Sequence, residues 1–268
     1  MGMTSQGTGA DHGVQIQRVG DGPKNLVFLH GLMGRGKNFS RFAKEISTEC
    51  TVLLVDLPNH GASAWTETID YRETAEQVSA AVEAELGEQP YHLVGHSMGG
   101  KVAMTMALTR PELIEKLMVV DIAPVQSWNS GGEFPHLLGS LRSVDLTAVA
   151  NRGEVDEQLS EPIPHPTVRG FLMQNLRHKD GQFGWQPNLD LLYSSLDTIG
   201  GFPEFDSTFD GPVTWVAGGE SQYVKEEYRP AMKKLFPQVR KVTVKGAGHW
   251  VHSQKPEEFT QLLRHFLD

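Results

Sequence analysis

The sequence predicts an α/β protein whose sheet is mostly parallel and is covered by helices on both faces. Short apolar runs alternate with longer segments in which apolar residues recur at helical spacing. Continuous apolar runs are typical of strands buried on both faces, and parallel strands need helical crossovers. The expected strands cover residues 25–29, 51–55, 91–94, 117–120, 213–217 and 239–244. The expected helices cover residues 37–47, 70–86, 98–109, 223–236 and 256–267, the second of them capped by Asp70 with Glu73.

One long stretch, residues 125–205, interrupts this alternation because it contains no convincing core strand. Val168, Phe171, Leu172 and Leu176 have helical spacing within it, and Asp180-Gly181 is typical of a tight hairpin turn. We therefore expect a helical cap, or lid, inserted into one core that consists of residues 14–124 and 206–268. Residues 1–13 are polar and rich in Gly, Ser and Thr, and are expected to form a flexible tail.

The composition excludes several classes of partner. The chain has 268 residues, with 24 Lys and Arg against 33 Asp and Glu, and a formal net charge of −9. Nucleic acids and acidic membranes attract basic surfaces, so neither is an expected partner. Cys50 is the single cysteine, which is typical of a reducing compartment. Because no long apolar run and no basic leader occur, the protein is expected to be cytoplasmic, without membrane insertion.

Residues 95–100 (GHSMGG) carry the strongest chemical signal. They follow an expected strand and open an expected helix, which is the context that the G-x-S-x-G nucleophile elbow requires. Side chains at Gly95 or Gly99 would collide with neighbouring chain, whereas the turn lifts the Ser97 hydroxyl above the sheet. A chance match on a surface turn is the alternative, and the strand–turn–helix context disfavours it. Ser97 is therefore the predicted nucleophile.

A serine hydroxyl needs a general base, and His249 is the best candidate among the 11 histidines. It lies in a loop between the last expected strand and the last expected helix, and it follows Ser97 as the order Ser, acid, His demands. His252 is the reserve candidate and is more simply explained as structural. His30 is expected to brace its own loop, and His96 to point away from the Ser97 side chain.

The acid of the predicted triad has two candidates. The usual position follows the fifth expected strand in a G-x-x-D pattern, but here residues 218–221 are GGES and Ser221 occupies the aspartate position. Glu220 lies one residue out of register. Asp121 lies at the carboxyl end of the fourth strand, from where it can reach the His249 loop across the top of the sheet. Asp121 is the preferred acid and Glu220 the alternative, whereas Asp56 is expected to order its own turn.

An oxyanion hole should complete the site. Its two backbone N–H groups are expected to come from Met98, directly after the nucleophile, and from Leu32, in the loop after the first core strand. Such a site needs no metal and no organic cofactor.

The loop that contains Leu32 also resembles a nucleotide-binding motif. Residues 31–37 match G-x-x-x-x-G-K after a strand, as in a P-loop. The next residue is Asn38, where a Ser or Thr would hold Mg²⁺. The oxyanion-hole interpretation is therefore preferred.

Taken together, the chain resembles the α/β-hydrolase superfamily, and within it a branch of small bacterial esterases and thioesterases and their mitochondrial relatives. The resemblance covers nearly the whole chain after residue 20. It depends on the segments LHGLMG (29–34), VDLPNHGAS (55–63), GHSMGGKVAM (95–104), RPELIEKL (110–117), VVDIAPV (119–125), GGESQYV (218–224) and GAGHWVH (246–252). In that branch the acid lies in the VVDIAPV segment, which implies Asp121 here. The resemblance implies an α/β-hydrolase fold and cleavage of short- to medium-chain esters or acyl thioesters.

The expected activity is therefore that of a serine hydrolase acting on a small ester or acyl thioester. Trp128, Phe134, Phe171, Phe183 and Trp185 are candidates for apolar wall material from the cap. The same triad could transfer acyl groups to alcohols or cleave a C–C bond. A ligand receptor without activity on this scaffold is the alternative of another class.

Overall fold

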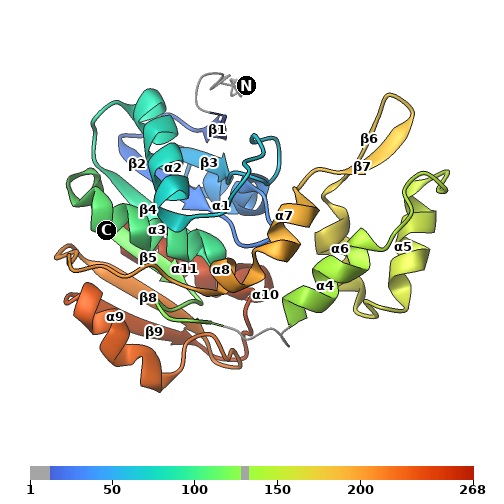
Figure 1. Ribbon diagram of the computed structural model, residues 1–268. Helices are drawn as coiled ribbons and strands as arrows, with labels where there is room; N and C mark the ends of the chain where they lie inside the picture. The colour runs from blue at the N-terminus through green and yellow to red at the C-terminus, as the bar shows by residue number, and fades with distance from the viewer. Residues whose placement is uncertain (1–12, 128–132) are drawn as a thin grey trace.

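The computed structural model describes residues 13–127 and 133–268, and its centre is a seven-stranded sheet (Figure 1). The strand order is β1-β3-β2-β4-β5-β8-β9, and every pairing is parallel except that of β1 with β3. This sheet confirms the predicted fold class. The strands are β1 (Gln15–Val19), β2 (Lys24–Leu29), β3 (Cys50–Asp56), β4 (Tyr91–His96), β5 (Ile114–Val120), β8 (Val213–Gly218) and β9 (Val239–Val244).

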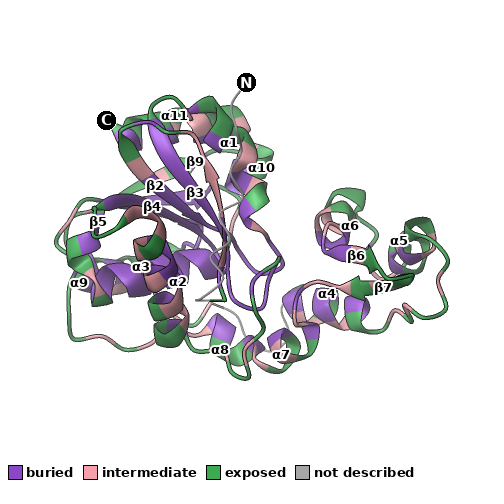
Figure 2. Cartoon of the chain, turned by 90° about the horizontal axis from the view of Figure 1, so that it is seen from above, coloured by how far each residue is buried: buried purple, intermediate pink, exposed green. Residues whose placement is uncertain are grey.

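The two faces of the sheet have separate apolar cores because successive side chains of a strand point to opposite sides. In β3, Leu53 and Val55 pack in one core, with residues of α2 (Tyr71–Leu86) and α3 (Met98–Thr109). Val52 and Leu54 pack in the other, with residues of the carboxyl-terminal helix. Figure 2 shows the buried sheet between these helical layers. The helices of the second layer are α1 (Ser40–Glu45), α10 (Val251–Gln254) and α11 (Pro256–Leu267).

Several predicted boundaries are corrected. The antiparallel edge strand β1 was not expected; its alternation of half-buried and buried positions is too short to stand out in the sequence. The predicted helix 37–47 is split into a 3-10 turn, η1 (Gly36–Phe39), and α1. The predicted helix 223–236 is likewise a 3-10 turn, η3 (Glu226–Tyr228), followed by α9 (Arg229–Leu235). A third 3-10 turn, η2 (Pro111–Leu113), leads into β5.

Helix α2 begins where the sequence predicts. The Asp70 carboxylate accepts hydrogen bonds from the backbone N–H groups of Arg72 and Glu73, at 2.7 and 3.0 Å. These bonds satisfy two of the donors that every helix start leaves unpaired. Helix α3 has the predicted bounds, and its start places the elbow at the carboxyl end of β4.

Between β5 and β8, the elements from α4 to α7 lie to one side of the sheet in both views, whereas α8 lies against the core (Figures 1 and 2). Within its described residues no strand joins the main sheet, and Asp180-Gly181 turns the predicted hairpin with positive φ at both residues. Leu176 begins a strand instead of continuing the expected helix. The elements are α4 (Glu133–Arg142), α5 (Arg152–Ser160), α6 (Pro166–Met173), β6 (Leu176–Lys179), β7 (Gln182–Trp185), α7 (Leu189–Ser194) and α8 (Leu196–Gly200).

Two sequence predictions concern residues outside the described ranges. Apart from Gly13, the tail predicted at residues 1–13 lies there, and so does Trp128. Among the helices described, none is both long enough and apolar enough to cross a bilayer.

Candidate active site

Ser97 is held in a strained turn between β4 and α3. Its φ of 53° and ψ of −121° belong to a region that costs a non-glycine residue roughly 1–3 kcal/mol. The neighbouring glycines make this turn possible. A Cβ at Gly95 would lie 2.3 Å from the carbonyl oxygen of Gly99, and a Cβ at Gly99 would lie 2.4 Å from that of His30. The collisions expected from the sequence are therefore present.

The structure brings Ser97, His249 and Asp121 together in one chain of hydrogen bonds. His249 Nε2 lies 2.8 Å from Ser97 Oγ, and His249 Nδ1 lies 2.8 Å from Asp121 Oδ2. A carboxylate can only accept, so Nδ1 carries the proton and Nε2 is free to accept from the serine hydroxyl. The three residues come from the carboxyl ends of β4, β5 and β9, which meet at one edge of a parallel sheet.

The Asp121 carboxylate is fully buried, and each of its oxygens has a partner. Oδ1 accepts a hydrogen bond from the backbone N–H of Gly218 at 2.8 Å. Oδ2 accepts from His249 and also from the hydroxyl of Ser221. The alternative acid, Glu220, is exposed, and its backbone N–H donates to the carbonyl of Ala247. Asp121, and not Glu220, is therefore the carboxylate that contacts His249.

Both predicted oxyanion donors lie close to the nucleophile. Leu32 lines the same pocket as Ser97, and Met98 begins α3 directly after it. Within the described part of the chain, neither backbone N–H donates a hydrogen bond to a protein acceptor. Both N–H groups are therefore free of protein acceptors among the described residues, as donors to an oxyanion must be.

The chain matches the family model of the alpha/beta hydrolase fold over residues 24–256. The chain belongs to the α/β-hydrolase superfamily. The mouse protein named sn-1-specific diacylglycerol lipase ABHD11 is 38% identical over 248 residues, which are 90% of this chain and 80% of the relative. The Escherichia coli protein Esterase YbfF is 28% identical over 91% of this chain and 92% of its own. A solved structure titled Marine microorganism esterase aligns with a TM-score of 0.90 and 31% identity, covering 94% and 98% of the two chains.

These relatives place the hydrolase in the branch of small bacterial esterases and their mitochondrial relatives, as the sequence motifs indicate. The chain is thus a hydrolase of the carboxylesterase type. The P-loop alternative is disfavoured by the same match. The loop with the P-loop-like sequence lines the pocket beside Ser97, through Gly31, Leu32 and Gly34.

Other histidines of the hydrolase hold the loops around the site. His30 donates from Nδ1 to the carbonyl of Gly31 at 2.8 Å and accepts at Nε2 from the N–H of Leu57 at 3.0 Å. It braces two loops, as expected, and burial lowers its pKa to about 4, so it stays neutral. Asp56 orders its turn by accepting from the N–H groups of Gly36 and Ala62.

His96 and His252 lie next to the loop that carries His249. His96 Nε2 lies 2.9 Å from the carbonyl oxygen of His249, which it can only meet as a donor. Burial lowers the pKa of His96 well below its ordinary value and that of His252 to about 4. Their rings lie 4.7 Å apart. Both are therefore neutral, and it is the His96 ring, not the Ser97 hydroxyl, that His252 contacts.

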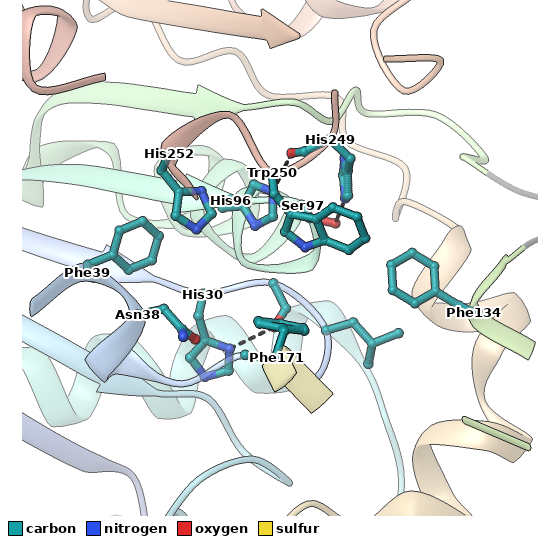
Figure 3. Close-up of a pocket in the computed structure, with 13 residues that line it drawn as sticks. His30, Asn38, Phe39, His96, Ser97, Phe134, Phe171, His249, Trp250 and His252 are labelled. Atoms are coloured by element: carbon teal, nitrogen blue, oxygen red, sulfur yellow. Dashed lines mark hydrogen bonds between the residues drawn. The ribbon is translucent and has the colours of Figure 1, made fainter. Parts of the chain in front are cut away.

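The pocket at Ser97 is nearly closed by aromatic side chains (Figure 3). Phe134 of α4 and Phe171 of α6 approach from the insertion, and Trp250 lies beside His249 on the core. Ser97 is only 1% exposed, and the cavity against it has a volume of about 10 Å³, no more than one water needs.

A larger cavity of about 600 Å³ adjoins this pocket between α6 and the core. Asn38, Phe171, Trp250 and His252 line both spaces, so the two lie next to each other. The larger cavity has a mixed lining, with Phe42 and Val168 on its apolar side and Arg41 among its polar residues.

Two of the aromatic residues predicted to line the pocket from the cap do so. Phe134 and Phe171 line the pocket, whereas Phe183 and Trp185 pack within the insertion, where the Trp185 indole N–H donates to the carbonyl of Leu141. Trp250 was missed, although its place directly after His249 was a usable signal. Tyr223, whose ring centroid lies 4.1 Å from that of His249, was missed too, since only its position in a loop after β8 hinted at it.

Proposed function

We propose that this protein is a serine hydrolase that cleaves short- to medium-chain carboxylic esters or acyl thioesters through an acyl-enzyme. One observation carries the proposal: the unbroken hydrogen-bond chain from Ser97 through His249 to Asp121, with both links at 2.8 Å. Ser97 is the nucleophile, His249 the general base, and Asp121 the group that holds the imidazole in the right tautomer.

In the acylation step, Ser97 Oγ attacks the carbonyl carbon while His249 Nε2 takes the hydroxyl proton. The imidazolium that forms is stabilised by the Asp121 carboxylate, which keeps its own charge. The N–H groups of Leu32 and Met98 hold the oxyanion of the tetrahedral intermediate. Each such donor contributes about 3–4 kcal/mol to transition-state stabilisation. His249 then protonates the leaving alcohol or thiol as its bond to the acyl carbon breaks.

In the deacylation step, a water takes the place of the leaving group. His249 removes its proton, hydroxide adds to the acyl carbon, and the bond to Ser97 Oγ breaks as that oxygen regains a proton. Every proton passes through His249, so the protein's own residues suffice for both steps.

The segment 125–205 serves as a cap over this site. Its contribution to the pocket comes from Phe134 and Phe171, and the adjoining cavity of about 600 Å³ offers room for a short to medium acyl chain or its leaving group. The names of the mouse lipase and the E. coli esterase support an ester as substrate. A thioester fits the same chemistry because its carbonyl and leaving group are handled alike.

A fluorophosphonate probe tests the nucleophile. We expect one adduct per chain, located at Ser97 by peptide mass spectrometry, and none in Ser97→Ala. A folded protein that does not react would support the receptor alternative and remove the hydrolase proposal. A panel of esters and acyl-CoA thioesters of increasing chain length then identifies the substrate class from kcat/KM.

Acyl transfer to an alcohol is a second candidate, favoured by the burial of Ser97 under aromatic side chains. A dry pocket disfavours water as acceptor. The partition of the acyl-enzyme between water and added ethanol distinguishes the two. A ratio of ester product to acid product above the mole ratio of ethanol to water would indicate a transferase. Formation of the acid product alone would indicate a hydrolase.

A further inference from the structure

Lys101 is a buried cation on the helix that carries the nucleophile elbow. It lies four residues after Ser97 on α3 and is 0% exposed. Most side chains of α3 after it are apolar, among them Val102, Met104 and Leu108. A buried ammonium is costly unless its donors are matched, and packing alone would be served as well by Met or Leu at this position.

Three backbone carbonyls accept hydrogen bonds from the Lys101 ammonium. The distances from Nζ are 3.1 Å to Val125 O, 2.5 Å to Gly200 O and 2.7 Å to Gly201 O. An ammonium has three donors, so this set satisfies all of them. Burial lowers the pKa of Lys101 to about 7. The carbonyl oxygens offset part of the cost of burial by stabilising the charged form.

These carbonyls belong to the two ends of the inserted segment. Val125 follows β5 and Asp121, where the chain leaves the core, and Gly200 and Gly201 close α8, where it returns (Figure 1). The two ends are also bonded to each other, because the N–H of Ser127 donates to Gly200 O at 2.8 Å. Lys101 thus connects three parts: the nucleophile helix, the exit of the insertion and its return.

A second hydrogen bond from the core also holds the returning end of the insertion. The hydroxyl of Tyr71, at the start of α2, donates to the carbonyl of Ile199 at 2.7 Å. Farther along, the insertion is also bonded to the core, by the N–H of Asn188 to the carbonyl of Asn59 at 3.0 Å and by the side-chain amide of Asn175 to the carbonyl of Met33 at 2.7 Å. What distinguishes the two ends is that they are bonded directly to α2 and to the nucleophile helix α3.

We propose that Lys101 is a positioning residue that fixes both ends of the insertion to the nucleophile helix, and thereby sets where the cap stands over Ser97. The proposal rests on the proposed function, in which the insertion is the cap of a serine hydrolase. Lys101 touches no reacting atom. Its effect is carried by α3 on one side and by the chain ends at Val125 and Gly200 on the other.

Lys101→Met tests this role, since it keeps an unbranched side chain of similar length and removes every donor. We expect hydrogen exchange at the amides of residues 125–127 and 199–202 to become about tenfold faster or more, while the central strands stay protected. KM for a long-chain p-nitrophenyl ester should rise about fivefold or more. A small fluorophosphonate is used to titrate the concentration of reactive sites. The kcat for the p-nitrophenyl acetate ester, calculated per reactive site, should change less than twofold. Lys101→Arg, which keeps the charge and donors, should recover part of both losses.

Lys116→Met is the matched control, because Lys116 Nζ also donates to a backbone carbonyl, that of Phe266 at 3.1 Å, away from the insertion. It should leave the exchange at both ends unchanged. Unchanged exchange in Lys101→Met, or a uniform increase over the whole chain, would overturn the proposal. Should Lys101→Met not fold, Lys101→Gln takes its place in the same measurement. The hydrogen-exchange experiment does not depend on catalytic activity. Failure of the wild-type protein to react with the fluorophosphonate would therefore refute the proposed hydrolase function without bearing on the exchange result.

Discussion

Ser221 donates a hydrogen bond to the same oxygen of Asp121 that His249 contacts. Ser221 stands in the G-x-x-D position where the usual triad acid would lie, and so the loop after β8 still reaches the acid, with a hydroxyl in place of a carboxylate. The N–H of Gly218, from the end of the same strand, holds the other oxygen of Asp121. The loop after β8 therefore orients an acid that the loop after β5 supplies.

Replacing Ser221 by Ala should lower kcat/KM for an ester about 10- to 100-fold. The change removes a hydrogen bond to a charged group, which is worth about 1.5–3 kcal/mol, and leaves Asp121 held by fewer partners. Ser221→Thr keeps the hydroxyl and should stay within a few-fold of wild type. Steady-state kinetics on a p-nitrophenyl ester measure both. Equal losses in the two variants would mean that packing, and not the hydroxyl, matters at this position.

Asp121→Asn and Glu220→Gln form a matched pair that identifies the acid. Asp121→Asn should reduce kcat by about 10⁴-fold, because the amide favours the wrong imidazole tautomer. Glu220→Gln should leave kcat within twofold, since the Glu220 side chain is exposed and Asp121 holds His249. The opposite pattern, with the loss confined to Glu220→Gln, would assign the acid to the other loop.

The positions of Ser97, Asp121 and His249 could be predicted because each follows an apolar strand, and parallel strands present their carboxyl ends at one edge. The orientation of the Asp121 carboxylate could not be predicted, since it depends on Gly218 at the end of β8 and Ser221 in the loop after it, 97 and 100 residues away. Strand β1 was missed for a related reason: its pairing with β3 is decided by the partner more than by its own sequence.

Phe171→Ala should merge the Ser97 pocket with the cavity of about 600 Å³, because the half-buried Phe171 ring lines both. We expect a long-chain fluorophosphonate to react severalfold faster, whereas a small one should gain little. Phe183→Ala is the control, as its ring packs on His178 in the hairpin and lines neither space. If both probes were accelerated equally in Phe171→Ala, general loosening of the cap would be the better explanation.

Buried neutral histidines should make the fold sensitive to acid. Burial, with the neighbouring His30, lowers the pKa of His60 to about 3, and burial lowers those of His30 and His252 to about 4. In the unfolded chain these groups have pKa values of about 6.5. Between about pH 6.5 and pH 4 the unfolded chain therefore binds more protons, and the free energy of unfolding falls as the pH falls.

His60→Asn isolates one such group, because the Asn amide can still donate to the carbonyl of Pro58 as His60 Nδ1 does. From pH 7 to pH 5, His60 alone should account for about 2 kcal/mol of the lost stability. Urea unfolding followed by tryptophan fluorescence at the two pH values should show a decrease that is smaller by about this amount in His60→Asn. The exposed His265 supplies the control, since His265→Asn should leave the decrease as in wild type. If the free energy of unfolding of His60→Asn fell between the two pH values by as much as that of wild type, His60 would be able to take up a proton without unfolding. The acid sensitivity would then arise from other groups.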